Sequence, residues 1–158
     1  MPLLKVLFEC KEASFSKKIS CANRGQEIKI NNLKLFNDHL NKEQREAVKM
    51  SLMAKELFIL HGPPGTGKTE TITEMILQHI NIGMKILVST SSNVAVDTIA
   101  ERLLRYNIHN QIQVCRIGHP VRILEEVKEI SVDNILEKKY KIGEDIEKIL
   151  LDEDMSDY

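Results

Sequence analysis

Residues 62–69 have the types and spacing that hold a phosphate group. They form the pattern G-x-x-x-x-G-K-T, preceded by a short apolar run and followed by a helical pattern. Glycines let the backbone approach an anion closely, so that several N–H groups can converge on phosphate oxygens beside the positive end of a helix. The residues expected to cradle the phosphates are Gly62, Pro63, Pro64, Gly65, Thr66 and Gly67.

Two side chains at the end of this loop have catalytic chemistry. We expect the amine of Lys68 to reach the β- and γ-phosphates of ATP, and the hydroxyl of Thr69 to ligate Mg²⁺. The sequence therefore predicts ATP and Mg²⁺ as cofactors. A glycine loop that binds no ligand is the alternative, and the strand and helix patterns on either side disfavour it.

Apolar runs separated by amphipathic helices predict an α/β fold of the P-loop NTPase type. Three runs, near residues 57–60, 85–89 and 112–117, have the pattern of buried parallel strands, and the phosphate loop follows the first of them. Alternation of strand and helix is typical of a parallel sheet flanked by helices. The carboxyl end of the first strand would then present the loop to its ligand.

The helices between these runs are predicted by caps and periodicity. Asn41, with Gln44 three residues later, matches a capping box and predicts a helix over about 42–54. After the loop, side chains at helical spacing predict a helix that Gly83 ends; they are Ile72, Met75, Ile76, His79 and Ile80. The same spacing predicts a further helix at Val94, Ile99 and Leu103.

Composition bounds the class of protein. The chain has 158 residues, the size of one ordinary domain, and a net charge of −1. The charge is uneven: residues 1–55 hold 11 basic and 6 acidic groups, and residues 125–158 hold 5 and 12. Three widely spaced cysteines give no disulfide framework, and neither a membrane-length apolar run nor a secretory leader is present. We expect a protein of the nucleus or cytoplasm with no membrane partner.

Two segments near the loop resemble motifs of superfamily 1 helicases. Residues 40–48 resemble the Q-motif, in which a glutamine, here Gln44, reads the adenine edge. Residues 88–97 resemble motif Ia, whose small polar residues at a helix start suit a nucleic-acid phosphate; Ser92 and Asn93 are the matching positions, and Ser91 replaces the usual proline. The plainer interpretations are that Gln44 completes a capping box, that Ser92 or Asn93 caps a helix, and that Asp97 is a structural hydrogen-bonding residue.

A third segment narrows the resemblance. Residues 116–123, Arg-Ile-Gly-His-Pro-Val-Arg-Ile, resemble a stretch of the superfamily 1B branch that includes the immunoglobulin mu-binding helicase, senataxin and the nonsense-mediated-decay helicase. The resemblance implies part of the first RecA-like domain of a 5′-to-3′ ATP-dependent helicase, with single-stranded DNA or RNA as its partner. Residues 1–32 would be the end of a stalk helix and a linker, 33–124 the partial RecA-like domain, and 125–158 a charged helical tail.

A working helicase also needs a Walker B segment, an apolar run that ends in Asp-Glu. The one candidate, residues 149–153, has apolar side chains at helical spacing amid charge, so we expect a helix there and a chain truncated before Walker B. The remainder of the helicase would then be a partner. The alternatives are a non-catalytic remnant that binds nucleotide or a protein, and an AAA+ ATPase domain. A zinc site at Cys115 and His119 has too few ligands to be favoured.

Overall fold

The predicted capping box forms and begins helix α2, Lys42–Met53. The side chain of Asn41 accepts a hydrogen bond from the Gln44 N–H at 2.8 Å, and the Asn41 N–H donates to Gln44 Oε1 at 2.9 Å. These bonds satisfy two of the donors that a helix start leaves unpaired. The helix predicted over about 42–54 is therefore confirmed.

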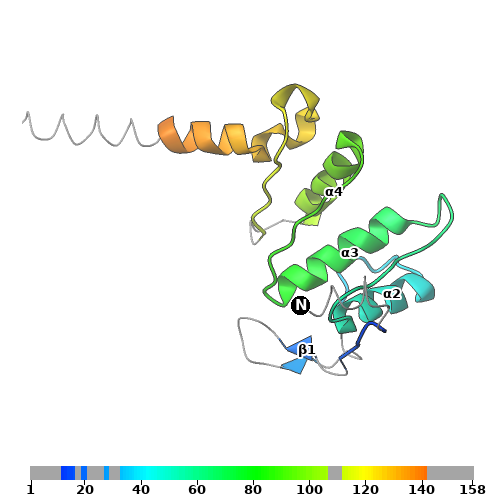
Figure 1. Ribbon diagram of the computed structural model, residues 1–158. Helices are drawn as coiled ribbons and strands as arrows, with labels where there is room; N and C mark the ends of the chain where they lie inside the picture. The colour runs from blue at the N-terminus through cyan, green and yellow to red at the C-terminus, as the bar shows by residue number, and fades with distance from the viewer. Residues whose placement is uncertain (1–11, 17–18, 21–26, 29–32, 107–111, 142–158) are drawn as a thin grey trace, which may run out of the picture. The chain divides into compact units, whose positions relative to one another are not determined.

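The computed structural model describes residues 12–16, 19–20, 27–28, 33–106 and 112–141 (Figure 1). The chain divides into two compact units, residues 1–88 and 89–158. Within the described ranges no helix is long and apolar enough to cross a bilayer. The predicted stalk-helix end at residues 3–9 and the Walker B candidate at 149–153 lie outside these ranges.

Helices α2 and α3 (Lys68–Asn81) pack against each other in the first unit (Figure 1). Leu40, Val48 and Met75 form the buried core between them, and Phe58 and Leu60 pack on it. Ile59, which lies between those two side chains, is 75% exposed. This alternation is that of an extended chain with one face on the core, and it leads directly into the phosphate loop.

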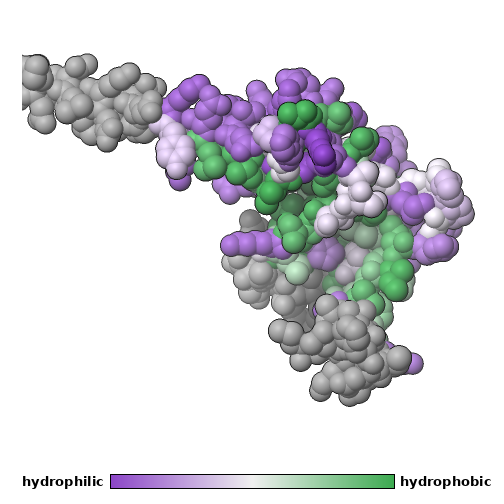
Figure 2. Space-filling view, turned by 45° about the horizontal axis from the view of Figure 1, so that its top comes forward, coloured by the Kyte–Doolittle hydropathy of each residue, from purple (hydrophilic) through white to green (hydrophobic). Residues whose placement is uncertain are grey.

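The three predicted parallel strands do not form in the part of the chain that the structure describes. Residues 57–60 and 85–89 form no strand, and residues 112–117 contain one isolated parallel bridge, from Arg116 to Ser131. A buried strand needs paired neighbours and two covered faces, whereas Leu87 is 88% exposed. Figure 2 shows such apolar surface in green. The parallel sheet stays a prediction.

Two short strands occur where the sequence predicted a linker. β1 (Ile19–Ser20) pairs antiparallel with β2 (Glu27–Ile28), and Phe15 forms an isolated antiparallel bridge with Ala54 at the end of α2. Nearby, the Ser14 hydroxyl donates to Glu56 Oε1 at 2.6 Å and the Ser14 N–H donates to Glu56 Oε2 at 2.8 Å. These hydrogen bonds hold the pKa of Glu56 below its ordinary value.

The buried face of α3 is wider than the predicted apolar stripe. Its buried residues are Thr71, Thr73, Glu74, Met75, Ile76, Leu77 and Gln78, whereas Ile72, His79 and Ile80 are only partly buried. Glu74 accepts hydrogen bonds from the N–H groups of Phe36 at 3.0 Å and Asn37 at 2.9 Å, and Gln78 Nε2 donates to the Lys34 carbonyl at 2.8 Å. The stripe missed these residues because hydrogen bonds to a distant segment, not apolar character, bury them.

The second unit is built on α4 (Asn93–Tyr106), the helix predicted at Val94, Ile99 and Leu103. Two short 3-10 helices follow, η2 (Pro120–Arg122) and η3 (Glu125–Ile130), and then a helix over residues 132–141. Ala100, Ile123 and Val127 form its buried cluster, which joins α4 to the segment around η3. The charged helices predicted after residue 121 are thus present as far as residue 141.

Candidate nucleotide-binding site

The phosphate loop closes on itself immediately before α3. Lys68 Nζ donates hydrogen bonds to the carbonyls of Gly62 and Pro63, both at 2.6 Å. Thr66 Oγ1 donates to the same Pro63 carbonyl at 2.8 Å. The first N–H groups of a helix have no acceptor within the helix, so the loop and the start of α3 together present donors to an anion.

Two glycines of the loop have backbone angles that residues with a Cβ rarely adopt. Gly65 has φ +79° and Gly67 has φ +74°. A Cβ at Gly65 would meet no atom within 4 Å, whereas a Cβ at Gly67 would lie 2.6 Å from Gln44 Nε2. Gly67 is therefore required twice, for its conformation and for the close approach of a side chain from α2.

That side chain, Gln44, reaches the loop from 22 residues earlier in the sequence. Gln44 Nε2 donates to the Thr66 carbonyl at 3.0 Å, while Oε1 accepts from the Asn41 N–H. An amide has two N–H donors and two acceptor lone pairs, so one donor and one lone pair remain for a base edge. The capping role is confirmed, and the adenine contact stays a prediction.

The residues of the loop fit a triphosphate with Mg²⁺. The Lys68 amine has three N–H donors, of which the loop carbonyls take two. Thr69 lies in the first turn of α3 and is partly buried. Among the described residues no group of three or more His, Cys, Asp or Glu side chains could hold a metal ion, Cys115 and His119 included. Mg²⁺ would therefore depend on Thr69 and on phosphate oxygens, which are the hard ligands that it prefers.

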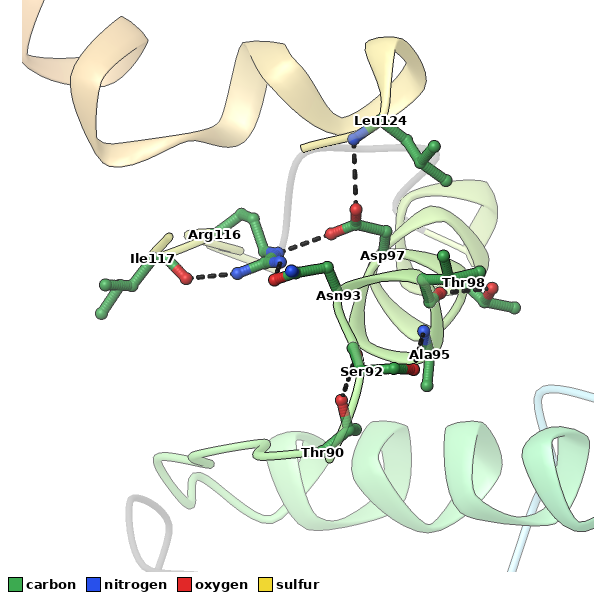
Figure 3. Close-up of polar contacts among 10 residues, drawn as sticks. Thr90, Ser92, Asn93, Ala95, Asp97, Thr98, Arg116, Ile117 and Leu124 are labelled. Carbon is green, nitrogen blue, oxygen red and sulfur yellow. Dashed lines mark hydrogen bonds and ion pairs between the residues drawn. The ribbon is translucent and has the colours of Figure 1, made fainter. Parts of the chain in front are cut away.

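The motif Ia positions lie in the second unit, at the start of α4. Ser92 Oγ accepts a hydrogen bond from the Ala95 N–H at 3.2 Å, as an N-cap does. Asn93 is exposed, and its Oδ1 accepts from Arg116 Nη2 at 3.1 Å (Figure 3). The capping role of Ser92 is confirmed, and phosphate contact by Ser92 and Asn93 stays a prediction.

Sequence reasoning assigned no role to two buried charged groups beside these positions. Arg116 is 7% exposed and Asp97 is 0% exposed, and Arg116 Nε lies 2.5 Å from Asp97 Oδ1. Asp97 Oδ2 also accepts from the Leu124 N–H at 3.1 Å. The structural alternative for Asp97 is thus confirmed. The available signal was a lone arginine in the apolar run 112–117, opposite a lone aspartate in an apolar helical stripe.

Comparison with known proteins places this geometry in a class. The family model described as AAA domain matches residues 39–155, a span that holds the Q-motif match, the phosphate loop and the motif Ia match. The chain therefore belongs to the AAA domain family, and it is a P-loop NTPase.

The relatives of the chain narrow the class to helicases. It is 46% identical over 104 residues to "DNA-binding protein SMUBP-2" of Rattus norvegicus, 66% of this chain and 10% of that protein. It is 45% identical over 104 residues to "DNA polymerase alpha-associated DNA helicase A" of Schizosaccharomyces pombe, 66% and 15%. An uncharacterized ATP-dependent helicase of Methanocaldococcus jannaschii is 38% identical over 113 residues, 71% and 17%. These names confirm the resemblance to superfamily 1 helicases, and the chain spans 10 to 17% of the length of these three relatives.

Proposed function

We propose that this chain binds ATP with Mg²⁺ as part of the first RecA-like domain of an ATP-dependent helicase that acts on single-stranded DNA or RNA. The observation that carries the proposal is the loop that Lys68 closes at the start of α3, with Gln44 held against it. The names of the relatives support a nucleic-acid substrate and a nuclear or cytoplasmic place of action. The domain would extend over residues 33–124.

Each residue of the site has a distinct part in this proposal. The N–H groups of residues 62–67 and the Lys68 amine bind and orient the phosphates, and the Thr69 hydroxyl offers an oxygen to the metal. Mg²⁺, when bound, supplies charge neutralisation at the phosphates. Gln44 holds the loop through Thr66 and offers its remaining donor and lone pair to the base.

Titration with a fluorescent ATP analogue and Mg²⁺ tests the nucleotide site. We expect Lys68→Ala to weaken binding by about ten- to hundredfold, because a hydrogen bond to a charged group is worth about 1.5–3 kcal/mol. The matched control is Lys85→Ala, which removes one exposed amine from the same unit and should bind as the wild type does. Equal affinity of the wild type and Lys68→Ala would contradict the proposal.

A further inference from the structure

A buried polar network joins three segments of the second unit at the start of α4 (Figure 3). The Arg116 guanidinium donates through Nε to Asp97 at 2.5 Å, through Nη2 to Asn93 Oδ1 at 3.1 Å, and through Nη1 to the Ile117 carbonyl. The second carboxylate oxygen of Asp97 accepts from the Leu124 N–H at 3.1 Å. One arginine therefore fixes the N-terminal turn of α4 to the chain around it.

The backbone of Arg116 is held as firmly as its side chain. Its N–H donates to the Ile130 carbonyl at 2.8 Å, and its carbonyl accepts from the Val132 N–H at 3.1 Å. A Cβ at Gly118 would lie 2.6 Å from Arg116 Nη1, so the chain after Arg116 passes directly over the guanidinium. The guanidinium is thus enclosed, with little freedom to turn away from Asn93.

This arrangement decides which end of the Asn93 amide faces outward. A guanidinium is a donor only, so it pairs with the amide oxygen and leaves the amide nitrogen as the available group. The nitrogen carries two N–H donors, which are what a phosphate oxygen requires. Asn93 is exposed, whereas Arg116 is 7% exposed and is used up in internal bonds. The donor available to a ligand is therefore the asparagine and not the arginine.

We propose that Arg116 is a positioning residue, which orients the Asn93 amide so that its nitrogen donates to a phosphate of single-stranded nucleic acid. The inference rests on the proposed function, since it assumes that the start of α4 contacts the strand. It also gives a role to Arg116 and Gly118 of the third helicase-like segment: they hold motif Ia in its binding form. Lysine at position 116 would keep the charge but could not make the three bonds in fixed directions.

A double-mutant cycle on the full chain tests this role. Affinity for fluorescein-labelled oligo(dT), with oligo(U) beside it, is measured by anisotropy for the wild type, Asn93→Ala, Arg116→Lys and the double variant. We expect each single change to weaken binding about tenfold, and the double variant to be no weaker than either single one. Arg105→Lys, at an exposed arginine paired with Glu101 on α4, is the control and should bind as the wild type does.

A second variant guards against loss of the fold and against direct phosphate contact. Arg116→Met with Asp97→Asn removes both buried charges and keeps an acceptor for the Leu124 N–H, so no charge is left unpaired. We expect weaker binding with an unchanged slope of log affinity against log salt. A slope smaller by about one would show that Arg116 itself neutralises a phosphate, and would overturn the positioning role.

The remaining outcomes separate this inference from the proposed function. Wild-type affinity in Arg116→Lys, or losses that add in the double variant, would overturn the positioning role and leave the helicase proposal standing. No binding of either oligonucleotide by the wild type would overturn both the positioning role and the nucleic-acid part of the proposed function.

Discussion

Gly67 shows how much a single residue of the phosphate loop must satisfy. It holds φ +74°, it is the N-cap of α3, and its Cα lies against the Gln44 amide. Gly65 holds nearly the same φ, +79°, with open space where a Cβ would lie. The two glycines thus differ only in the neighbour, which makes them a matched pair.

We expect Gly67→Ala to be more damaging than Gly65→Ala. Both variants bear the strain of alanine at positive φ, about 1–2 kcal/mol, which urea denaturation measures. Only Gly67→Ala also displaces Gln44, so it should lose more affinity for the ATP analogue. Adding Gln44→Ala should remove that extra loss, because the clash disappears with the side chain. Identical affinities of the two alanine variants would show that Gln44 is irrelevant to the loop.

Gln44 itself is expected to govern the choice of base. Gln44→Ala should leave the affinity for the triphosphate nearly unchanged but bring the affinities for ATP and GTP close together, because the amide donor and acceptor for adenine are lost. Competition of ATP and GTP for the same fluorescent analogue gives this ratio within each variant, so a change in stability cancels. A ratio unchanged from the wild type would show that the amide serves only the cap and the loop.

Glu56 provides a test in the pH dependence. The Ser14 hydroxyl and N–H lower the pKa of this carboxyl, so its charged form stabilises the fold above the ordinary pKa. That contribution is lost as the pH falls through the lowered pKa. We expect Ser14→Ala to raise the pKa of Glu56 toward its ordinary value, as followed by ¹³C NMR of the carboxyl. Glu137, whose pKa is lowered by Lys141, should not move and serves as the internal control.

At the scale of elements, buried polar side chains tie each helix to a segment distant in sequence. Glu74 and Gln78 of α3 bind residues 34–37, which lead into the capping box of α2. Asp97 of α4 binds Arg116 and the Leu124 N–H. The helix that starts at the phosphate loop and the helix that starts at motif Ia are thus both anchored by a carboxylate on their buried face.

The anchor of α3 is expected to matter for stability. Glu74→Ala leaves the N–H groups of Phe36 and Asn37 without their acceptor, and we expect it to lower the free energy of unfolding by about 2–5 kcal/mol. Urea denaturation measures the change. Glu101→Ala, which removes an exposed carboxylate paired with Arg105 on α4, should cost less than about 1 kcal/mol. Similar midpoints for the two variants would mean that the contacts of Glu74 contribute little.

At the scale of the whole molecule, nucleotide binding and nucleotide hydrolysis are separate expectations. Phosphoryl transfer requires cradled phosphates, a fixed Mg²⁺, an oriented water and neutralisation of the developing charge. Residues 62–69 address the first two requirements. The Walker B candidate at 149–153 has a helical pattern, and the chain matches 10 to 17% of the length of its relatives.

We therefore expect this chain alone to turn over ATP at about 10⁻³ s⁻¹ or more slowly and to unwind no duplex, because an arginine supplied by a partner is typically worth three to five decades in rate. A steady-state ATPase assay with and without single-stranded DNA or RNA measures this, with Lys68→Ala as the blank. Stimulated turnover near one per second, lost in Lys68→Ala, would show that residues 149–153 or a partner complete the site.

Local chemistry in the sequence determined the phosphate loop, the capping box and the positions of α2, α3 and α4. Each depends on residues within a few positions of one another, such as Asn41 with Gln44 or the glycines before Lys68. The tertiary structure alone decided which polar groups are buried: Glu74 on residues 36 and 37, Gln44 on Thr66, and Arg116 between Asp97 and Asn93. Hydrogen bonds across about 20 to 40 residues leave no periodicity in the sequence, because the pattern of one helix records its own apolar face and not the backbone that packs against it.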